Sequence, residues 1–180
     1  PLREQMVLAG RAFPIIVSEV YEVKDEPYKM TIDALDSLKK NQVPLLATNN
    51  CVTSALWGEL LSTASRARGA RGTIVDGLSR DMKKILAMRY PVFCTGMMPT
   101  DSKGRADFID YNCPVRSGDA FVRPGDIVFA DSDGIVAIPS EEEDEVLKVA
   151  YAKVSTENTV RRELLSGKLL REAWAKHRTL

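Results

Sequence analysis

Three short apolar runs, separated by segments with helical periodicity, constrain the fold more than any other feature of the chain. Each run is bounded by glycine, proline or asparagine and has the length of a buried strand. Strands that alternate with helices pair in parallel, and the helices pack outside the sheet. The sequence therefore predicts an α/β fold with strands over 10–20, 43–48, 72–77 and 91–96 and helices over 30–42, 55–69 and 80–90.

The second half of the chain has a different pattern. After a polar segment, 99–112, short alternating runs separated by S-G-D, P-G-D and D-S-D-G turns predict a meander of hairpins up to residue 139. From Ser140, a plausible N-cap, the sequence is helical, with a break at 166–167. We expect a core domain over 1–139 and a C-terminal helical segment over 140–180 that packs on the core or on a neighbouring subunit.

Composition argues against several classes of function. Lys and Arg total 25, as do Asp and Glu, so no net field favours nucleic acid. No apolar run is long enough to cross a membrane. The three cysteines, Cys51, Cys94 and Cys113, lack the spacing of disulfide or zinc motifs, and His177 is the single histidine. We expect a cytoplasmic protein whose chemistry uses carboxylates, lysine, arginine and backbone groups.

Two opposite charges, Arg80 and Asp81, follow the buried strand 72–77. In parallel α/β units, ligands collect where strands end and helices begin. Adjacent side chains at a helix start diverge by about 100°, so Asp81 can address a hard cation while Arg80 addresses an anion. The alternative interpretation is structural: Asp81 favours the helix dipole and Arg80 is solvated.

A second pair, Gly58 and Glu59, lies at the corresponding place in the preceding unit. Glycine there permits close backbone approach to a ligand, and Glu59 offers a second carboxylate, or else is a solvated helix residue. The sequence "DSDG", 131–134, is typical of an Asx turn rather than a calcium loop. The acidic run 141–145 is typical of a solvated helix start. The chain contains no G-x-G-x-x-G motif for a dinucleotide.

Taken together, "WGELLSTASRARGARGTIVDGLSRD" and "RPGDIVFADSDGIVAIP" resemble the family of regulator of ribonuclease activity A (RraA) and the related 4-hydroxy-4-methyl-2-oxoglutarate aldolases. The resemblance covers residues 2–170. It implies a three-layer swivelling β/β/α domain with a C-terminal helical extension. It also implies a homotrimer or a dimer of trimers, with the site between adjacent subunits, and Mg²⁺ or Mn²⁺ as cofactor.

The aldolase branch of this family is similar in having an acidic residue, twenty residues, and then Arg-Asp. Glu59, 60–79 and Arg80-Asp81 reproduce that spacing. The resemblance implies that Asp81 ligates the metal and that Arg80 binds the pyruvyl oxygens. It also implies two sets of residues that complete the site: backbone amides near Gly58, Glu59, Leu60 and Leu61 for the substrate carboxylate, and Glu157 of an adjacent subunit at the metal, directly or through water.

The chain departs from the aldolase pattern at two places. Residue 59 is Glu where many aldolases have Asp, which changes the reach of the carboxylate toward a metal. The loop "TNNCVTS", 48–54, replaces a Gly-rich turn that is frequent in relatives. We expect the residues that contact the substrate tail in 49–54, in 97–110 and in a neighbouring chain.

The resemblance favours a divalent-metal pyruvate aldolase that cleaves a 4-hydroxy-2-oxo acid, such as 4-hydroxy-4-methyl-2-oxoglutarate, and decarboxylates oxaloacetate. The catalytic residues would be Arg80, Asp81 and Glu59, since both reactions need a stabilised enolate. The main alternative is a non-catalytic protein that binds a ribonuclease. That branch typically loses the aspartate that this chain keeps as Asp81. A Schiff-base aldolase using Lys83 or Lys84 is a third hypothesis.

Overall fold

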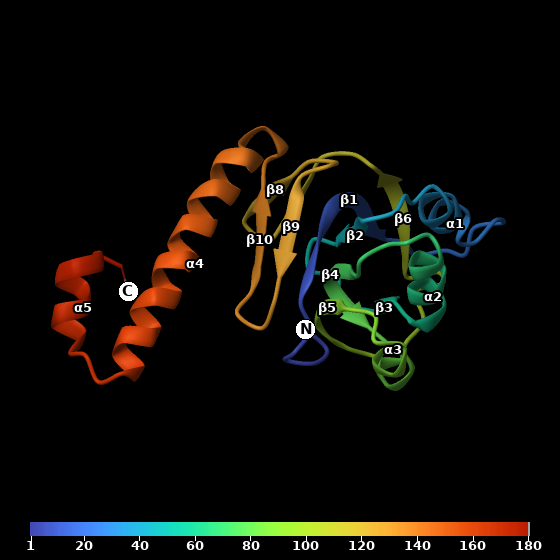
Figure 1. The fold of residues 1–180 in the computed structure, drawn as a ribbon. Helices are drawn as coiled ribbons and strands as arrows, with labels where there is room; N and C mark the ends of the chain where they lie inside the picture. Colours follow the sequence, from blue (N-terminus) through green and yellow to red (C-terminus); the bar gives the residue numbers. More distant parts are fainter. Residues whose placement is uncertain (180) are drawn as a thin grey trace. The chain divides into compact units, whose positions relative to one another are not determined.

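The structure is a computed structural model that describes residues 1–179. The chain forms two compact units (Figure 1). The first unit, Pro1–Ser140, contains all ten strands of the described residues and three α-helices. The second unit begins at Glu141, and its described residues contain two α-helices and no strand. Among the described residues, no helix is both long and apolar enough to cross a membrane.

The first unit is built on an eight-stranded mixed sheet. Its centre is parallel: β1 pairs with β2, β2 with β4, and β4 with both β3 and β5. The remaining strands, β6, β9 and β10, join antiparallel. The strands are β1 (Leu8–Glu19), β2 (Gln42–Ala47), β3 (Ala55–Trp57), β4 (Thr73–Ser79), β5 (Val92–Met97), β6 (Ala106–Tyr111), β9 (Ile127–Ala130) and β10 (Ile135–Ile138).

Strand β4 carries the chain to the site, and it changes partner along its length. Its first half pairs with β2 and its end pairs with β3, with an irregularity in the β5 pairing between Val75 and Leu78. The carbonyls of Asp76 and Gly77 in this gap accept hydrogen bonds from the hydroxyls of Thr48 and Thr95. These side-chain hydrogen bonds satisfy two carbonyl groups at the irregularity. Strand β4 therefore continues past it to Ser79.

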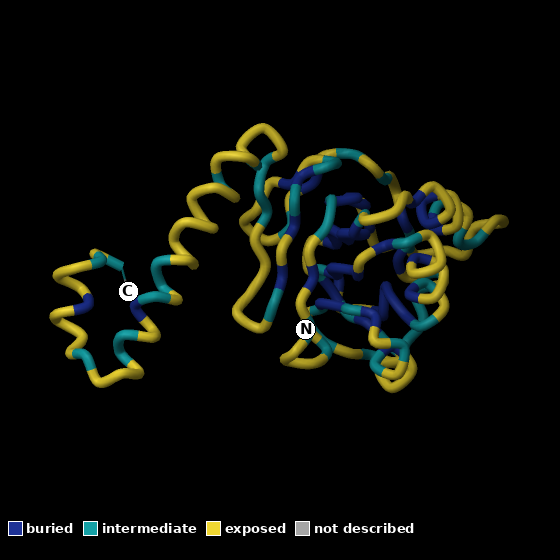
Figure 2. The backbone as a smooth tube through the Cα atoms, viewed as in Figure 1, coloured by how far each residue is buried: buried dark blue, intermediate teal, exposed yellow. Residues whose placement is uncertain are grey.

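The sheet is covered on both faces, which gives the three-layer β/β/α architecture expected from the sequence. Alternate residues of β2 point to opposite sides: Leu46 joins the core cluster under the helices, and Leu45 joins the cluster under the small sheet. Figure 2 shows this buried interior inside an exposed shell. The covering elements are α1 (Lys29–Asp36), α2 (Glu59–Ala67) and α3 (Met82–Met88) on one face and β7 (Val115–Ser117) and β8 (Ala120–Val122) on the other.

Three element boundaries differ from the sequence prediction. The segment 55–57, predicted as the start of a helix, is strand β3, because Gly58 in an extended conformation separates it from α2. The helix predicted over 30–42 ends at Asp36, although Leu38 is still buried. The polar segment 99–112 contains β6, whose pairing with β1 is a long-range contact that local periodicity does not indicate.

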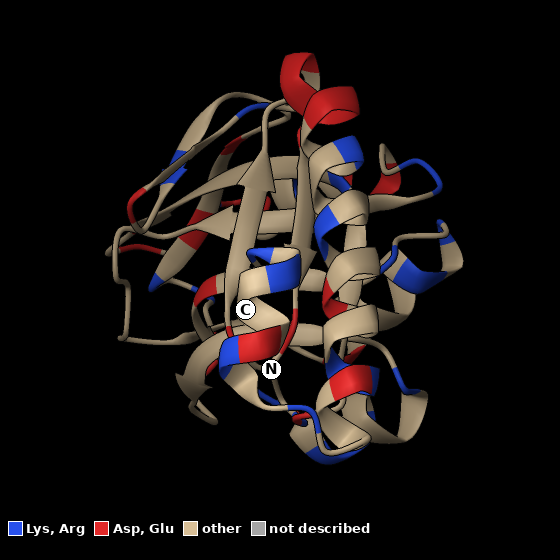
Figure 3. Ribbon diagram, turned by 60° about the vertical axis from the view of Figure 1, so that its left-hand side comes forward, with Lys and Arg blue, Asp and Glu red and all other residues tan. Residues whose placement is uncertain are grey.

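The second unit consists of α4 (Glu143–Leu165) and α5 (Leu170–His177), preceded by a short 3-10 turn, Ser140–Glu142. Ser140 therefore begins that turn and does not cap α4. The acidic residues at the start of α4 suit the positive end of its dipole (Figure 3). Gly167, with φ of 93°, ends the helix as predicted.

Candidate active site

Arg80 and Asp81 follow the end of β4, as the sequence predicted, but their side chains do not diverge. Asp81 adopts a left-handed backbone conformation, φ 59° and ψ 27°, and α3 begins only at the next residue. Asp81 Oδ2 consequently lies 3.8 Å from Arg80 Nε. A left-handed conformation in a non-glycine residue is strained, and aspartate is among the residues that tolerate it best. The local backbone thus brings the two charges to one place.

Gly58 is the N-cap of α2 and lies directly against this pair. A Cβ atom at Gly58 would be 2.9 Å from Asp81 Oδ2 and 3.2 Å from Arg80 Cγ, closer than atoms normally approach. The next amide, Glu59 N, donates a hydrogen bond to Asp81 Oδ2 at 3.2 Å. The backbone conformation does not explain the glycine, since its φ of −158° is available to any residue. The close approach of Arg80 and Asp81 does explain it.

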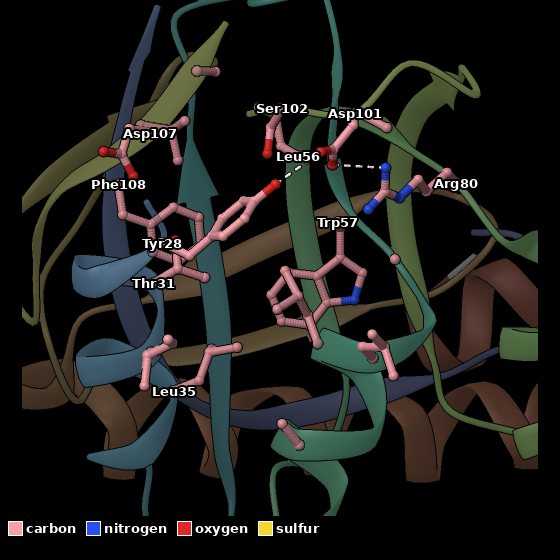
Figure 4. Close-up of a pocket in the computed structure, with 18 of the residues that line it drawn as sticks. Tyr28, Thr31, Leu35, Leu56, Trp57, Arg80, Asp101, Ser102, Asp107 and Phe108 are labelled. Carbon is pink, nitrogen blue, oxygen red and sulfur yellow. Dashed lines mark hydrogen bonds and ion pairs between the residues drawn. The ribbon is translucent and has the colours of Figure 1, made fainter. Parts of the chain in front are cut away.

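Two residues that sequence reasoning did not single out complete the polar end of the site. Asp101 Oδ1 is 2.7 Å from Arg80 Nη1, and the Tyr28 hydroxyl donates to Asp101 Oδ2 at 2.7 Å (Figure 4). Burial of Asp101 raises its pKa, but the Tyr28 hydrogen bond and the Arg80 charge lower the pKa more, so the net shift is downward. Burial and the hydrogen bond to Asp101 raise the pKa of Tyr28 to about 12. Asp101 stays ionised and holds Arg80.

A cavity of about 410 Å³ opens beside these residues. This volume is within the range of small-molecule sites. The loop 49–54, where we expected contacts with the substrate tail, contributes no lining residue, whereas 97–110 contributes several. The lining comes from β1, Tyr28 and α1, β3, α2, the two residues after β4 and the segment 101–108, and includes Gly58, Glu59, Leu60, Leu61, Arg80 and Asp81.

The first turn of α2 offers backbone donors at the cavity. The first amides of a helix have no carbonyl to bond within the helix. Glu59 N is used by Asp81. Ser62 N bonds to the Gly58 carbonyl. The amides of Leu60 and Leu61 lie between these two, at the positive end of the helix dipole, where an anion is stabilised.

The Glu59 side chain is at the cavity but is engaged along α2. Its Oε1 accepts a hydrogen bond from Thr63 at 3.0 Å, and its Oε2 is 3.9 Å from Lys84 Nζ. Lys84 is exposed and paired, so it lacks the desolvated environment that activates a Schiff-base lysine. Lys83, also exposed, is no better placed.

The donor set fits a hydrated divalent cation rather than a closed protein cage. Within residues 1–179, no three His, Cys, Asp or Glu side chains gather to hold an ion. Asp81 is a half-exposed carboxylate that lines the cavity. Mg²⁺ commonly binds one or two carboxylates, keeps several waters and takes its remaining ligands from the substrate. Glu157, the other predicted ligand, is on α4 in the second unit, where it pairs with Lys153 at 3.7 Å.

Comparison with models of known protein families finds a match to most of the first unit. The family model described as "RraA-like: Aldolase/RraA" matches residues 1–137. The chain belongs to this RraA-like family. The match contains the polar end of the site and the whole lining of the cavity.

Two curated relatives of this RraA-like chain are similar at about the same level. Protein DlpA of Legionella pneumophila is 31% identical over 173 residues, which is 96% of this chain and 28% of DlpA. A Halalkalibacterium halodurans protein named "Putative 4-hydroxy-4-methyl-2-oxoglutarate aldolase" is 34% identical over 107 residues, 59% of this chain and 50% of the relative. The chain thus spans half or less of the length of these two relatives.

A solved RraA structure confirms the fold. Streptomyces coelicolor RraAS2, described as an unusual member of the RNase ES inhibitor RraA protein family, superposes with a TM-score of 0.76 at 24% identity. The superposition covers 87% of this chain and 77% of that protein. The likeness establishes a shared architecture for this RraA-like chain.

Proposed function

We propose that this protein is a divalent-metal-dependent pyruvate aldolase that cleaves a 4-hydroxy-2-oxo acid, such as 4-hydroxy-4-methyl-2-oxoglutarate, and also decarboxylates oxaloacetate. The observation that carries the proposal is the meeting of Arg80, Asp81 and the first turn of α2 at one end of the cavity. A ribonuclease-binding protein has no need of a cation ligand beside an anion-binding arginine. The names of aldolase relatives agree with this choice.

Each residue at the polar end has a role that its surroundings support. Arg80, held by Asp101, donates to the keto and carboxylate oxygens of the pyruvyl half. The amides of Leu60 and Leu61 bind the same carboxylate. Glu59 accepts the proton that leaves the 4-hydroxyl group, directly or through a water. Asp81, joined by Glu157 of an adjacent subunit, would hold Mg²⁺ or Mn²⁺, which supplies Lewis-acid polarisation of the keto oxygen when bound.

The experiment that tests this function is pyruvate release from oxaloacetate and from 4-hydroxy-4-methyl-2-oxoglutarate. It is run with excess Mg²⁺ or Mn²⁺, again after EDTA, and again with the metal restored. We expect activity that EDTA abolishes and metal restores. The matched variant is Asp81→Asn, because asparagine tolerates the left-handed backbone and removes only the charge.

Two outcomes would count against the enzyme. Wild-type turnover by Asp81→Asn would remove Asp81 from the metal site. Absence of pyruvate release by the wild-type protein from both dicarboxylates and from a hydroxy acid with an uncharged tail, 4-hydroxy-2-oxoheptanoate, with either metal, would favour the alternative, a protein that binds a ribonuclease. A pull-down with ribonuclease partners is then the next measurement.

A further inference from the structure

The walls of the cavity restrict the part of the substrate that lies beyond the pyruvyl half, here called the tail. We propose that the preferred substrate is a 4-hydroxy-2-oxo acid with an uncharged, apolar tail, and that a second carboxylate is disfavoured. This inference rests on the proposed function, because it takes the pyruvyl half to bind at Arg80. It departs from the dicarboxylate in the names of the aldolase relatives.

The space available to the tail is lined mainly by apolar side chains. In Figure 4, Arg80 stands at one side of the cavity, and Thr31 and Leu35 of α1 stand at the opposite side. A tail directed away from Arg80 therefore meets the wall formed by α1, α2, β3 and β6. The apolar side chains of that wall are Ile32, Leu35, Leu56, Trp57, Leu61, Ala64 and Phe108.

Most of this wall is fixed in the core. Leu35, Trp57 and Phe108 are each less than 5% exposed. Leu35 and Phe108 have no polar side-chain atom, and the Trp57 indole N–H already donates to Ser62 Oγ at 2.8 Å, so these side chains offer a ligand only apolar surface. Burying alkyl groups against them stabilises a complex by about 25 cal/mol for each Å² of apolar surface removed from water.

The charged side chains of the lining are almost all negative. Arg80 is the single cationic side chain among the described lining residues, and the carboxylates are those of Asp36, Glu59, Asp81, Asp101 and Asp107. Arg80 is already shared between Asp101, at 2.7 Å, and Asp81, at 3.8 Å.

The cations that pair with the other carboxylates do not line the cavity. Lys24 binds Asp107 at 2.8 Å, and Lys84 and Arg68 pair with Glu59 and Asp36. A second substrate carboxylate would therefore find no further cation among the described lining residues of this chain and would face like charges. Burying a charge without a partner carries a large free-energy cost. A neutral tail avoids that cost.

The pair of substrates that tests this is 4-hydroxy-2-oxoheptanoate and 4-hydroxy-2-oxoglutarate. In both, the C3–C4 bond breaks, the 4-hydroxyl loses its proton, and C3 takes the electron pair and a proton to give pyruvate. The other product is butanal or glyoxylate. We expect kcat/KM, measured as pyruvate release with Mg²⁺, to be at least about tenfold higher for the heptanoate. An equal or higher value for the glutarate would overturn the inference.

A binding measurement separates this inference from the proposed function. The acids 2-oxoheptanoate and 2-oxoglutarate lack the 4-hydroxyl and cannot be cleaved. Calorimetry should give a lower Kd for 2-oxoheptanoate, again by about tenfold. That preference without turnover of any hydroxy acid would retain the apolar tail site and reject the aldolase. Turnover of a hydroxy acid together with tighter binding of 2-oxoglutarate would retain the aldolase and reject the apolar tail site. If neither 2-oxo acid bound, the inference would be overturned.

A single substitution should move the preference. Ile32 is 56% exposed and lines the cavity, so Ile32→Lys adds a cation there with little disturbance of the core. We expect the ratio of the two Kd values to shift toward 2-oxoglutarate by about tenfold. Asp33→Asn is the matched control, since it changes the net charge equally on the exposed face of α1 outside the cavity. An equal shift in the control, or none in Ile32→Lys, would contradict the tail site.

Discussion

Single residues at the site act through their neighbours, and Asp101 is the clearest case. Its carboxylate joins the Arg80 guanidinium to the Tyr28 hydroxyl. Replacing it by asparagine removes the charge that holds Arg80 and replaces the charged acceptor of the Tyr28 hydroxyl by a neutral amide oxygen. The consequences should be visible both in catalysis and in the titration of a tyrosine.

We expect Asp101→Asn to lower the Tyr28 pKa from about 12 part of the way toward 10, because burial, the largest cause of the shift, remains. In the wild type, this raised pKa means that the contribution of Tyr28 to stability is complete below about pH 10 and is lost as the pH rises through 12. The measurement is a difference titration of tyrosinate absorbance between variant and wild type. Identical curves would contradict the contact.

Gly58 gives a second prediction at this scale. In Gly58→Ala the added methyl group displaces the Asp81 carboxylate and the Arg80 side chain. We expect kcat/KM for pyruvate release to fall at least about tenfold, since small displacements at a reacting centre are costly. The free energy of unfolding should change by less than about 1 kcal/mol. Gly96→Ala, whose Cβ would meet only the Leu78 side chain, should retain activity. Equal losses in both variants would refute the steric argument.

Sequence reasoning found the site residues that follow directly from a strand end or a helix start. Arg80, Asp81 and Gly58 are of this kind, and the structure brings them together at the cavity. Tyr28 and Asp101 are 73 residues apart, and no local pattern indicates that they meet. The left-handed backbone of Asp81 is equally invisible in the sequence, so the divergence of the two charges was wrongly predicted.

At the scale of elements, local chemistry also explains which boundaries were predictable. Gly69, with φ of 82°, and Gly167 follow α2 and α4 as expected, because glycine adopts the conformation that ends a helix. Asn49 and Asn50 are also left-handed, a conformation that asparagine tolerates. In contrast, β3 and β6 depend on pairing with β4 and β1, which a local window cannot contain.

The pair α4 and α5 is joined by one carboxylate. Glu163 lies 2.6 Å from Lys176, 2.9 Å from Lys168 and 3.1 Å from His177. Hydrogen bonds from Lys176 and Lys168 lower its pKa to about 2. The stabilisation of this pair of helices is therefore present above about pH 4.3 and is lost as the pH falls toward 2.

We expect Lys176→Ala to raise the Glu163 pKa toward its ordinary value, because the largest cause of the shift is removed. Carboxyl carbon chemical shifts followed against pH measure this directly. Lys153→Ala is the control on the same helix, since Lys153 pairs with Glu157 instead. A Glu163 pKa that stays low in Lys176→Ala would show that the pairing is not what lowers it.

At the scale of the whole molecule, the proposed site is shared between subunits. If Asp81 of one subunit acts with Glu157 of another, then Asp81→Asn and Glu157→Gln should each be inactive alone. Co-expressed in equal amounts, they should recover about a quarter of the wild-type activity, because random assembly joins two intact halves in that fraction of interfaces. Pyruvate release by the whole co-expressed protein, without selection of mixed assemblies, measures this. No recovery would contradict a site that Asp81 shares with Glu157 of an adjacent subunit.

The pairing of β1 has a consequence for how the chain reaches its native state. One edge of β1 pairs with β2. The other edge pairs with β6 and β9, which are synthesised about a hundred residues after β1. Contacts of such sequence separation slow folding, and an open strand edge invites pairing with another chain. In a nascent chain released before Ala130, β1 would be an unprotected edge strand, although it is an inner strand of the complete sheet. Premature termination there should yield aggregates rather than a smaller working domain.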